Sequence, residues 1–211
     1  MMKLYYAETM NSYKTRALAR HVALDIDFQC LDLSKGEQRS AEFLAINPNG
    51  KAPALVDGDH CLWESNAIMC YLAMKAGSDL WPRDERQVEV IKWFSWSAEH
   101  FCRFAGQLYF ENIIRAKFGI GAPDPEAVEE ALGYVRRYTG ILNDHMENRR
   151  YLLGDTLTIA DFAVATALPY AQDAKIPLAD FPAVARWHNR LMEIPAWRSP
   201  FTQDESQSKV A

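Results

Sequence analysis

The spacing of hydrophobic positions changes several times within the first part of the chain. Residues 3–7, which are mainly apolar and aromatic, predict a short buried strand, and residues 26–31, IDFQCL, predict a second strand. Between these runs, residues 13–23 switch to the spacing of an amphipathic helix. The chain therefore opens with a strand, a helix and a second strand.

The next segment combines a short helix with a predicted β-hairpin. A helix after Ser40 must end before the sequence NPNG, because proline and glycine cannot continue it. In APALVDGDHCLW, two β-prone runs flank Asp57-Gly58, a pair that is typical of a hairpin turn. A helix then begins at about Ser65, and its expected buried side consists of Ala67, Ile68, Tyr71 and Leu72. The predicted order is βαβαββα, a small mixed sheet flanked by helices.

Strand patterns disappear after a polar stretch at residues 76–86, and helical spacing takes over. FGIGAPDPEA interrupts the first long helix, and helical spacing resumes over residues 126–147. A further apolar helix begins at Thr158-x-x-Asp161, which resembles a capping box, and a last helix is predicted at 181–193. The first long helix is predicted by residues that recur three or four positions apart and so lie along one face: Val90, Phe94, Ser97, Phe101, Phe104 and Leu108.

These patterns divide the chain into two domains. We predict an α/β domain at residues 1–77, a linker at 78–86 and an all-helical domain at 87–201. The polar residues 202–211 are expected to form a mobile tail.

Composition excludes several classes of function. The chain has 211 residues, of which 49% are hydrophobic and 24% charged, so it can bury a substantial core. A formal net charge of -5 without a basic cluster argues against nucleic-acid binding. The sequence has no signal-peptide pattern and no apolar run of about 18 residues. We therefore expect a cytoplasmic protein that has neither a nucleic acid nor a membrane as partner.

The cysteines and histidines show no metal-binding spacing. The four cysteines are scattered without a CxxC pair, which predicts small buried thiols rather than a disulfide framework. None of the five histidines has further ligands at useful offsets, so we expect no metal. The cysteines are Cys30, Cys61, Cys70 and Cys102.

The sequence NPNGKAPAL places a proline directly before an apolar strand. Pro53 cannot donate to a sheet ladder, so it should occupy the first position of the strand. If its peptide bond is cis, the backbone of Ala52 turns outward and can pair with an extended ligand. An ordinary trans proline is the alternative, and it is favoured by frequency alone.

A second polar stretch, WESNAI, lies where the predicted hairpin meets a helix. Backbone amides and a serine hydroxyl at a helix start bind carboxylates, and a nearby glutamate can pair with an ammonium group. Glu64 and Ser65 could therefore hold the α-amino acid end of one ligand. Alternatively, Ser65 only caps its own helix.

Four motifs give the chain a resemblance to a known family. They are NPNGKAPAL, WESNAI, LLGDTLTIADFAV and FPAVARWHNRL, and they extend over nearly the whole chain. The chain resembles the cytosolic glutathione transferases, which implies a thioredoxin-like domain followed by an all-α domain. Within that superfamily, Thr9, Asn11 and Lys14 are similar to the pattern after the first strand in the bacterial nu-class, the type that handles glutathione disulfide.

The resemblance implies that glutathione binds along one edge of the sheet domain. Its γ-glutamyl end would contact Glu64 and Ser65, and its cysteine backbone would contact Ala52 beside Pro53. Gln38 and Lys51 would contact its glycine carboxylate. The implied substrate-binding residues, in chain order, are Gln38, Lys51, Ala52, Pro53, Glu64 and Ser65.

The same resemblance places the glutathione thiol over the start of the first helix, with Thr9, Asn11 and Ser12 as the implied catalytic residues. Neutral donors and the positive end of a helix favour a thiolate over a thiol. Lowering a thiol pKa of about 8.5 by about two units requires roughly 2.7 kcal/mol, which one or two hydrogen bonds to a charged acceptor can supply. Asn11 stands where other classes place a cysteine, so a mixed disulfide through that position is excluded.

The chain departs from the nu-class pattern at several positions. Met10 replaces a common proline and Ser12 replaces a glycine, so a serine-hydroxyl mechanism remains a rival. Tyr5 and Tyr6 precede the loop, and we interpret them as strand packing rather than as catalytic tyrosines. Glu130 falls near the position from which the nu-class supplies an arginine.

The resemblance implies a glutathione transferase whose co-substrate thiolate attacks a small electrophile or reduces a disulfide, with peroxidase activity as a further option. A non-catalytic binding or regulatory module of the same fold is the alternative. A homodimer is also implied. An aromatic stripe either lines a pocket for an apolar electrophile or forms helical core; its members are Phe101, Phe104, Leu108 and Tyr109.

Overall fold

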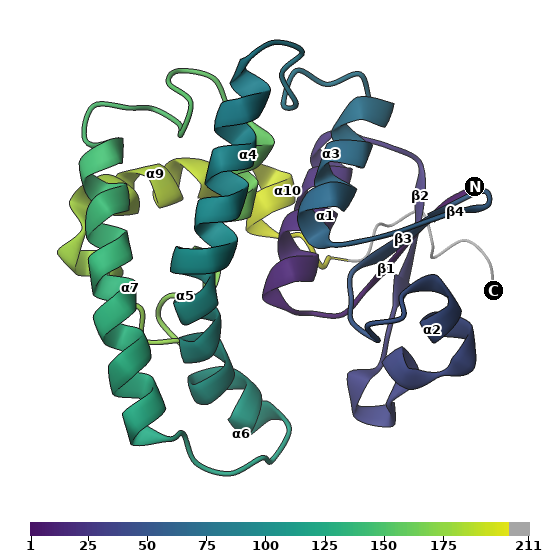
Figure 1. Ribbon diagram of the computed structural model, residues 1–211, viewed down its shortest axis with the longest axis horizontal. Coiled ribbons are helices and arrows are strands. Elements are labelled where there is room, and N and C mark those ends of the chain that lie inside the picture. Colours follow the sequence, from purple (N-terminus) through teal and green to yellow (C-terminus); the bar gives the residue numbers. More distant parts are fainter. Residues whose placement is uncertain (203–211) are drawn as a thin grey trace.

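The computed structural model describes residues 1–202, and these begin with a four-stranded sheet (Figure 1). In the sheet the order is β2-β1-β3-β4, with β1 parallel to β2 and antiparallel to β3. Leu4 of β1 lies opposite Phe28 of β2 and Leu55 of β3, so apolar residues meet at the centre of the sheet. The strands are β1 (Met2–Tyr6), β2 (Ile26–Cys30), β3 (Ala54–Asp57) and β4 (His60–Trp63).

Three helices complete this domain: α1 (Met10–His21), α2 (Ala41–Ile46) and α3 (Ser65–Lys75). Helices α1 and α3 lie between the sheet and the helical part of the molecule, whereas α2 lies on the far side (Figure 1). The predicted order βαβαββα is confirmed, as is the thioredoxin-like class of this domain.

The hairpin turn and the buried side of α3 differ from the prediction. The turn is Gly58-Asp59, one residue later than expected, because Asp57 still belongs to β3 and Gly58 adopts the positive φ of 60° that a tight hairpin needs. On α3, Ala67 is exposed, and half-buried Tyr71 donates its hydroxyl hydrogen bond to Asp57 (2.7 Å). The buried side of α3 consists of Ile68, Met69, Leu72 and Ala73.

The rest of the described chain is helical, which confirms the predicted all-α domain. Two π-helical segments, Ser97–Phe101 and Phe110–Ile114, join the first three helices of this second domain into one continuous rod. The boundaries at 77 and 86 remain a prediction. The helices are α4 (Arg86–Trp96), α5 (Cys102–Tyr109), α6 (Arg115–Lys117), α7 (Pro125–Met146), α8 (Ile159–Ala165), α9 (Pro182–Met192) and α10 (Pro195–Arg198). Short 3-10 turns lie at Leu33–Lys35, Glu37–Arg39, Leu168–Tyr170 and Leu178–Asp180.

The aromatic stripe of the first long helix is mainly core. Phe101 and Leu108 are fully buried, and Phe104 stacks on Tyr134 of α7 with ring centroids 4.1 Å apart. Among the four residues considered for an electrophile pocket, only Tyr109 lines a cavity beside the start of α1. The core interpretation therefore holds for the other three.

The predicted capping box at the start of α8 is present, and its aspartate does more than cap. Asp161 is completely buried and accepts hydrogen bonds from the backbone N–H groups of Leu152 and Thr158 (2.9 Å each) and from Nε1–H of Trp187 (3.0 Å). Burial raises the pKa of this carboxyl to about 6, against the opposing effect of its hydrogen bonds. Asp161 thus connects α8, α9 and the loop at Leu152.

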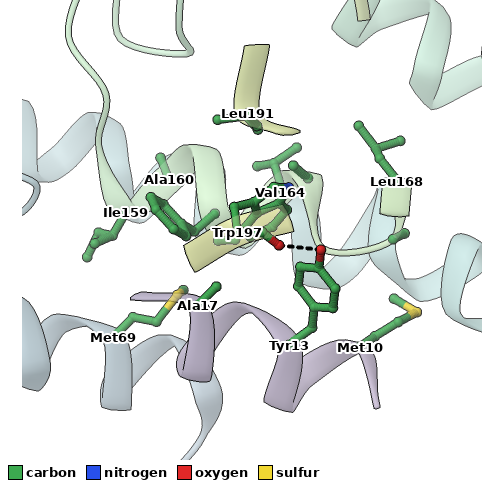
Figure 2. Close-up of a cluster of buried hydrophobic side chains, with 14 of the residues drawn as sticks. Met10, Tyr13, Ala17, Met69, Ile159, Ala160, Val164, Leu168, Leu191 and Trp197 are labelled. Carbon is green, nitrogen blue, oxygen red and sulfur yellow. Dashed lines mark hydrogen bonds between the residues drawn. The ribbon is translucent and has the colours of Figure 1, made fainter. Parts of the chain in front are cut away.

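The helical domain holds α1 in place by packing and by hydrogen bonds (Figure 2). Figure 2 shows Tyr13 and Ala17 of α1 facing Trp197 of α10, with the Tyr13 hydroxyl donating to the Trp197 carbonyl. The Thr166 hydroxyl, just after α8, donates to the carbonyl of Met10. The first turn of α1 is therefore fixed from the side of the helical domain.

The prediction that the cysteines are buried needs correction. Cys30 and Cys61 are exposed rather than buried, because both lie at the edges of the sheet domain, and the described cysteines are all free thiols.

Within residues 1–202, no helix has both the length and the apolar character that crossing a bilayer requires. The predicted mobile tail lies, apart from Thr202, outside the described residues.

Candidate functional site

Two adjoining cavities lie beside the first turn of α1. The larger, of about 690 Å³, separates α1 and α3 from the rod formed by α4, α5 and α6. The smaller, of about 120 Å³, extends along the loop that precedes β3. Four residues line both cavities: Asn11, Lys51, Glu64 and Ser65.

The three predicted catalytic residues lie in different surroundings. Asn11 is exposed and lines both cavities, and half-buried Thr9 lines the larger one. Ser12 is completely buried and lines neither cavity. Its Oγ accepts the N–H of Ala7 (3.3 Å) and the hydroxyl of Thr9 (3.4 Å). These contacts place Ser12 in the turn between β1 and α1, away from the surface of both cavities.

Ser65 does not cap its own helix. The N-cap of α3 is Glu64, whose side chain makes no capping hydrogen bond, and Ser65 is the first helical residue. Its hydroxyl donates to Oδ1 of Asn11 in a long contact of 3.5 Å, across a separation of 54 residues in sequence. Within residues 1–202 the side-chain amide N–H groups of Asn11 donate to no other residue, so they are available to a ligand.

Glu64 adopts a backbone conformation that is unusual for a residue other than glycine. Its φ is 69°, in the left-handed region, and its side chain is exposed. Such a conformation has a cost, and it often marks a functional position. Here it directs the chain from β4 into α3 at the mouth of both cavities.

The loop before β3 contains the remaining predicted binding residues. The Ala52-Pro53 peptide bond is cis, so the trans alternative was wrong, and Pro53 precedes Ala54, the first residue of β3. Ala52 and Pro53 both line the smaller cavity together with exposed Lys51. Gln38 lies on the turn Glu37–Arg39, is half-buried and lines neither cavity. The structure therefore brings together all of the predicted binding residues except Gln38.

Lys14, one turn beyond Asn11, introduces a buried positive charge. Only 5% of its surface is exposed, and its Nζ donates to Oδ1 of Asn66 at 2.8 Å. Burial lowers the pKa of Lys14 to about 8, while the nearby Glu64 and Cys102 oppose this shift. Lys14 lines the larger cavity and therefore places a cation beneath it.

Of the opposite wall of the larger cavity, only Tyr109 was named from sequence as a possible pocket residue. The wall is formed by one face of the α4–α6 rod and includes Arg103, Gly106 and Tyr109. Spacing by three and four residues predicts such a face, but it does not distinguish the core side from a cavity side. Glu130, the position suggested by family resemblance, is exposed on α7 and lines neither cavity.

The strand tyrosines are packing residues, as predicted. Tyr5 packs edge-on against Phe43 of α2, and Tyr6 stacks on Phe201. Neither lines either cavity beside α1.

A thioredoxin-like sheet, an all-helical partner domain and a polar cavity at the start of α1 together define the fold class of the cytosolic glutathione transferases. The comparison with known sequences agrees. Residues 1–74 match the glutathione S-transferase N-terminal domain, and residues 101–195 match the C-terminal domain. The chain belongs to the glutathione S-transferase family.

Individual relatives extend over nearly the full length of the chain. Glutathione S-transferase 3 of Zea mays is 33% identical, with 89% of this chain and 87% of the relative aligned. The disulfide-bond oxidoreductase YfcG of Escherichia coli (strain K12) is also 33% identical, with 93% and 92% aligned. A solved glutathione transferase family member from Pseudomonas fluorescens pf-5, with two glutathione bound, has a TM-score of 0.85 at 26% identity and covers 94% of this chain and 91% of its own. The oxidoreductase among these relatives is consistent with the predicted resemblance to disulfide-handling transferases.

Proposed function

We propose that the protein is a glutathione-dependent enzyme that binds glutathione in the smaller cavity and presents its thiolate in the larger one. The observation that carries this proposal is the meeting of Asn11 and Ser65, from α1 and α3, at the boundary between the two cavities. The family and its named relatives support the same activity.

The donors and acceptors along the smaller cavity fit the three parts of the tripeptide. The Ser65 hydroxyl and the first amides of α3, an 11-residue helix, suit the γ-glutamyl carboxylate, and exposed Glu64 suits the ammonium beside it. The backbone of Ala52 suits the cysteine part, and the Lys51 ammonium suits the glycine carboxylate. Gln38 remains a proposed residue for this last contact.

The sulfur would then lie at the start of α1, where three features favour its ionised form. The 12-residue helix α1 contributes the positive end of its dipole. Asn11 and Thr9 supply neutral donors at the cavity surface, and Lys14 supplies a buried positive charge. No side chain of the protein needs to act as nucleophile.

These residues would support either transfer or reduction. In transfer, the sulfur forms a bond to an electrophilic carbon and displaces its leaving group. In reduction, the sulfur attacks a disulfide, one thiolate leaves, and a second glutathione thiol completes the two-electron exchange.

We also propose a cytoplasmic homodimer. Exposed apolar residues on neighbouring secondary structure elements support self-association: Trp63, Met74, Val88 and Ile91.

Replacement of Asn11 by alanine tests the assignment of the sulfur contact. Loss of one hydrogen bond to a thiolate should cost about 1.5–3 kcal/mol, so kcat with a chloro-nitroaromatic should fall by about 10-fold to 150-fold. The dissociation constant of glutathione, measured by calorimetry below the thiol pKa, should change less than threefold, because the thiol form needs no such donor.

Asn148→Ala is a matched control, since Asn148 is exposed and lines neither cavity beside α1. Equal losses in rate and affinity for Asn11→Ala would contradict its role at the sulfur. Tight glutathione binding by the wild-type protein without turnover of electrophiles, disulfides or peroxides would favour the non-catalytic alternative.

Ser65→Ala tests the carboxylate contact. Because Ser65 would donate to a charged group, glutathione affinity should weaken by about 1–3 kcal/mol. Within residues 1–202 its hydroxyl has only the distant Asn11 Oδ1 as a partner, so the fold should not suffer. Calorimetric titration of this variant beside Ser95→Ala, an exposed position on α4, measures the effect. Unchanged affinity would remove Ser65 from the site.

A further inference from the structure

The helical wall of the larger cavity offers an apolar surface with several aromatic rings opposite the start of α1. Tyr109, Phe110 and Phe118 supply aromatic rings, while Ala98 and Gly106 leave room between them. A Cβ atom added at Gly106 would meet no atom within 4 Å, so the space beside this glycine is open. Such a wall suits a planar apolar group.

Arg103 places a positive charge in this apolar wall. It lies between Ala98 and Gly106 in the chain, lines the cavity and is exposed. Among residues 1–202 it has no ion-pair partner and no side-chain hydrogen bond; its only described interaction is with the Phe104 ring, 5.5 Å from the guanidinium carbon. Its five N–H donors are therefore available to a ligand.

The other two cations of the cavity have different surroundings. Lys14 is buried and hydrogen-bonded to Asn66. Lys51 lies on the side of the smaller cavity, where we place the glycine carboxylate. Only Arg103 belongs to the helical wall. An anion that reaches Arg103 would therefore belong to the second substrate.

Other arginines of the described chain show what a structural role looks like here. Arg136 pairs with Asp180 at 2.6 Å, and Arg149 donates to the carbonyl of His145 at 2.7 Å. Arg137 resembles Arg103 in having a ring, Tyr138, as its described partner, but it lines neither cavity beside α1. Position in the cavity wall is what separates Arg103 from Arg137.

We propose that the acceptor subsite takes a planar aromatic electrophile that carries a carboxylate, with the ring on the wall of Tyr109 and Gly106 and the carboxylate on the guanidinium of Arg103. This inference rests on the proposed function, because it names the second substrate of the same site. A guanidinium binds a carboxylate through two parallel hydrogen bonds, which gives orientation as well as affinity.

A matched pair of substrates tests the proposal: 4-chloro-3,5-dinitrobenzoate and its neutral amide. In both reactions the glutathione sulfur bonds to the ring carbon, chloride leaves with the electron pair of the C–Cl bond, and the thiol proton passes to solvent. For each substrate, kcat/KM is divided by the uncatalysed rate constant with glutathione. We expect the wild-type enzyme to favour the benzoate by about tenfold on this scale.

Arg103→Met should abolish that preference by lowering kcat/KM for the benzoate much more than kcat/KM for the amide, and Arg103→Lys should retain part of it. Arg137→Met should behave as the wild type. A benzoate preference that is equal in wild type and Arg103→Met, or absent from a wild-type enzyme that turns over both substrates, would overturn the inference.

Calorimetry with the two finished glutathione conjugates repeats the test without turnover. If the wild-type protein prefers the benzoate conjugate and Arg103→Met does not, the result supports the carboxylate subsite. This holds even if both substrates prove inert. In that case the proposed catalytic function fails while the inference stands. Equal affinities of the wild-type protein for the two conjugates overturn the inference.

Discussion

Replacing Lys14 by methionine is expected to make the free protein more stable and the enzyme much slower. The Lys14 ammonium is almost completely buried beneath the larger cavity, with one hydrogen bond to Asn66. An opposite charge within about 4–6 Å lowers the pKa of an acid by about one to three units. Removal of this charge should raise the pKa of bound glutathione by a similar amount, and each unit reduces the rate below that pKa about tenfold.

The stability effect of Lys14→Met has the opposite sign. The pKa of Lys14, about 8, lies below the usual lysine value of 10.5, so the native state binds fewer protons than the unfolded state between these two pH values. The free energy of unfolding therefore decreases as the pH falls through this window, and the full cost of the buried charge is present below pH 8. Allowing for the lost Asn66 hydrogen bond, Lys14→Met should stabilise the free protein by about 2 kcal/mol at pH 7.

Two measurements check this prediction together. The ultraviolet absorbance of bound thiolate, followed against pH, reports the thiol pKa, and denaturant unfolding reports stability. Lys51→Met is the matched control, since Lys51 lines the same cavity but is exposed. It should weaken glutathione binding and leave the thiol pKa in place. A Lys14→Met protein that is less stable, with an unchanged thiol pKa, would show that Lys14 serves only the fold.

Among the variants considered, Asp161→Ala is expected to lower the free energy of unfolding the most. The substitution leaves three buried N–H donors, those of Leu152, Thr158 and Trp187, without an acceptor. Each unsatisfied group costs about 1–3 kcal/mol, so the free energy of unfolding should fall by about 3–5 kcal/mol. Asp173→Ala, at an exposed position, should change it by less than about 0.5 kcal/mol.

The pH dependence of this difference gives a second test. The pKa of Asp161, about 6, lies above the usual aspartate value of 3.8, so the native state binds the proton more readily than the unfolded state. The contribution of this group to stability is therefore greatest below about pH 4 and is lost as the pH rises through 6. The difference between wild type and Asp161→Ala should grow by about 1 kcal/mol between pH 7 and pH 5. A difference that shrinks over this range would show that the native carboxyl is not raised in pKa.

The sequence by itself determined the order of elements, because that order depends on local chemistry. The periods of the apolar positions separate strands from helices, Thr158 and Asp161 mark a helix start, and Pro53 marks a strand start. Family resemblance added the polar residues at the turn before α1. These signals lie within a few residues of one another, so no long-range contact is needed to interpret them.

Tertiary structure decided which side chain faces which environment. Thr9, Asn11 and Ser12 are neighbours in sequence, yet only packing buries Ser12 and exposes Asn11. Only packing brings Ser65 to Asn11, across 54 residues. Helical spacing alone could not separate the cavity face with Arg103 from the buried face with Phe101, because both recur with the same period. The physical reason is that burial depends on what the rest of the fold places opposite a side chain, and that partner is distant in sequence.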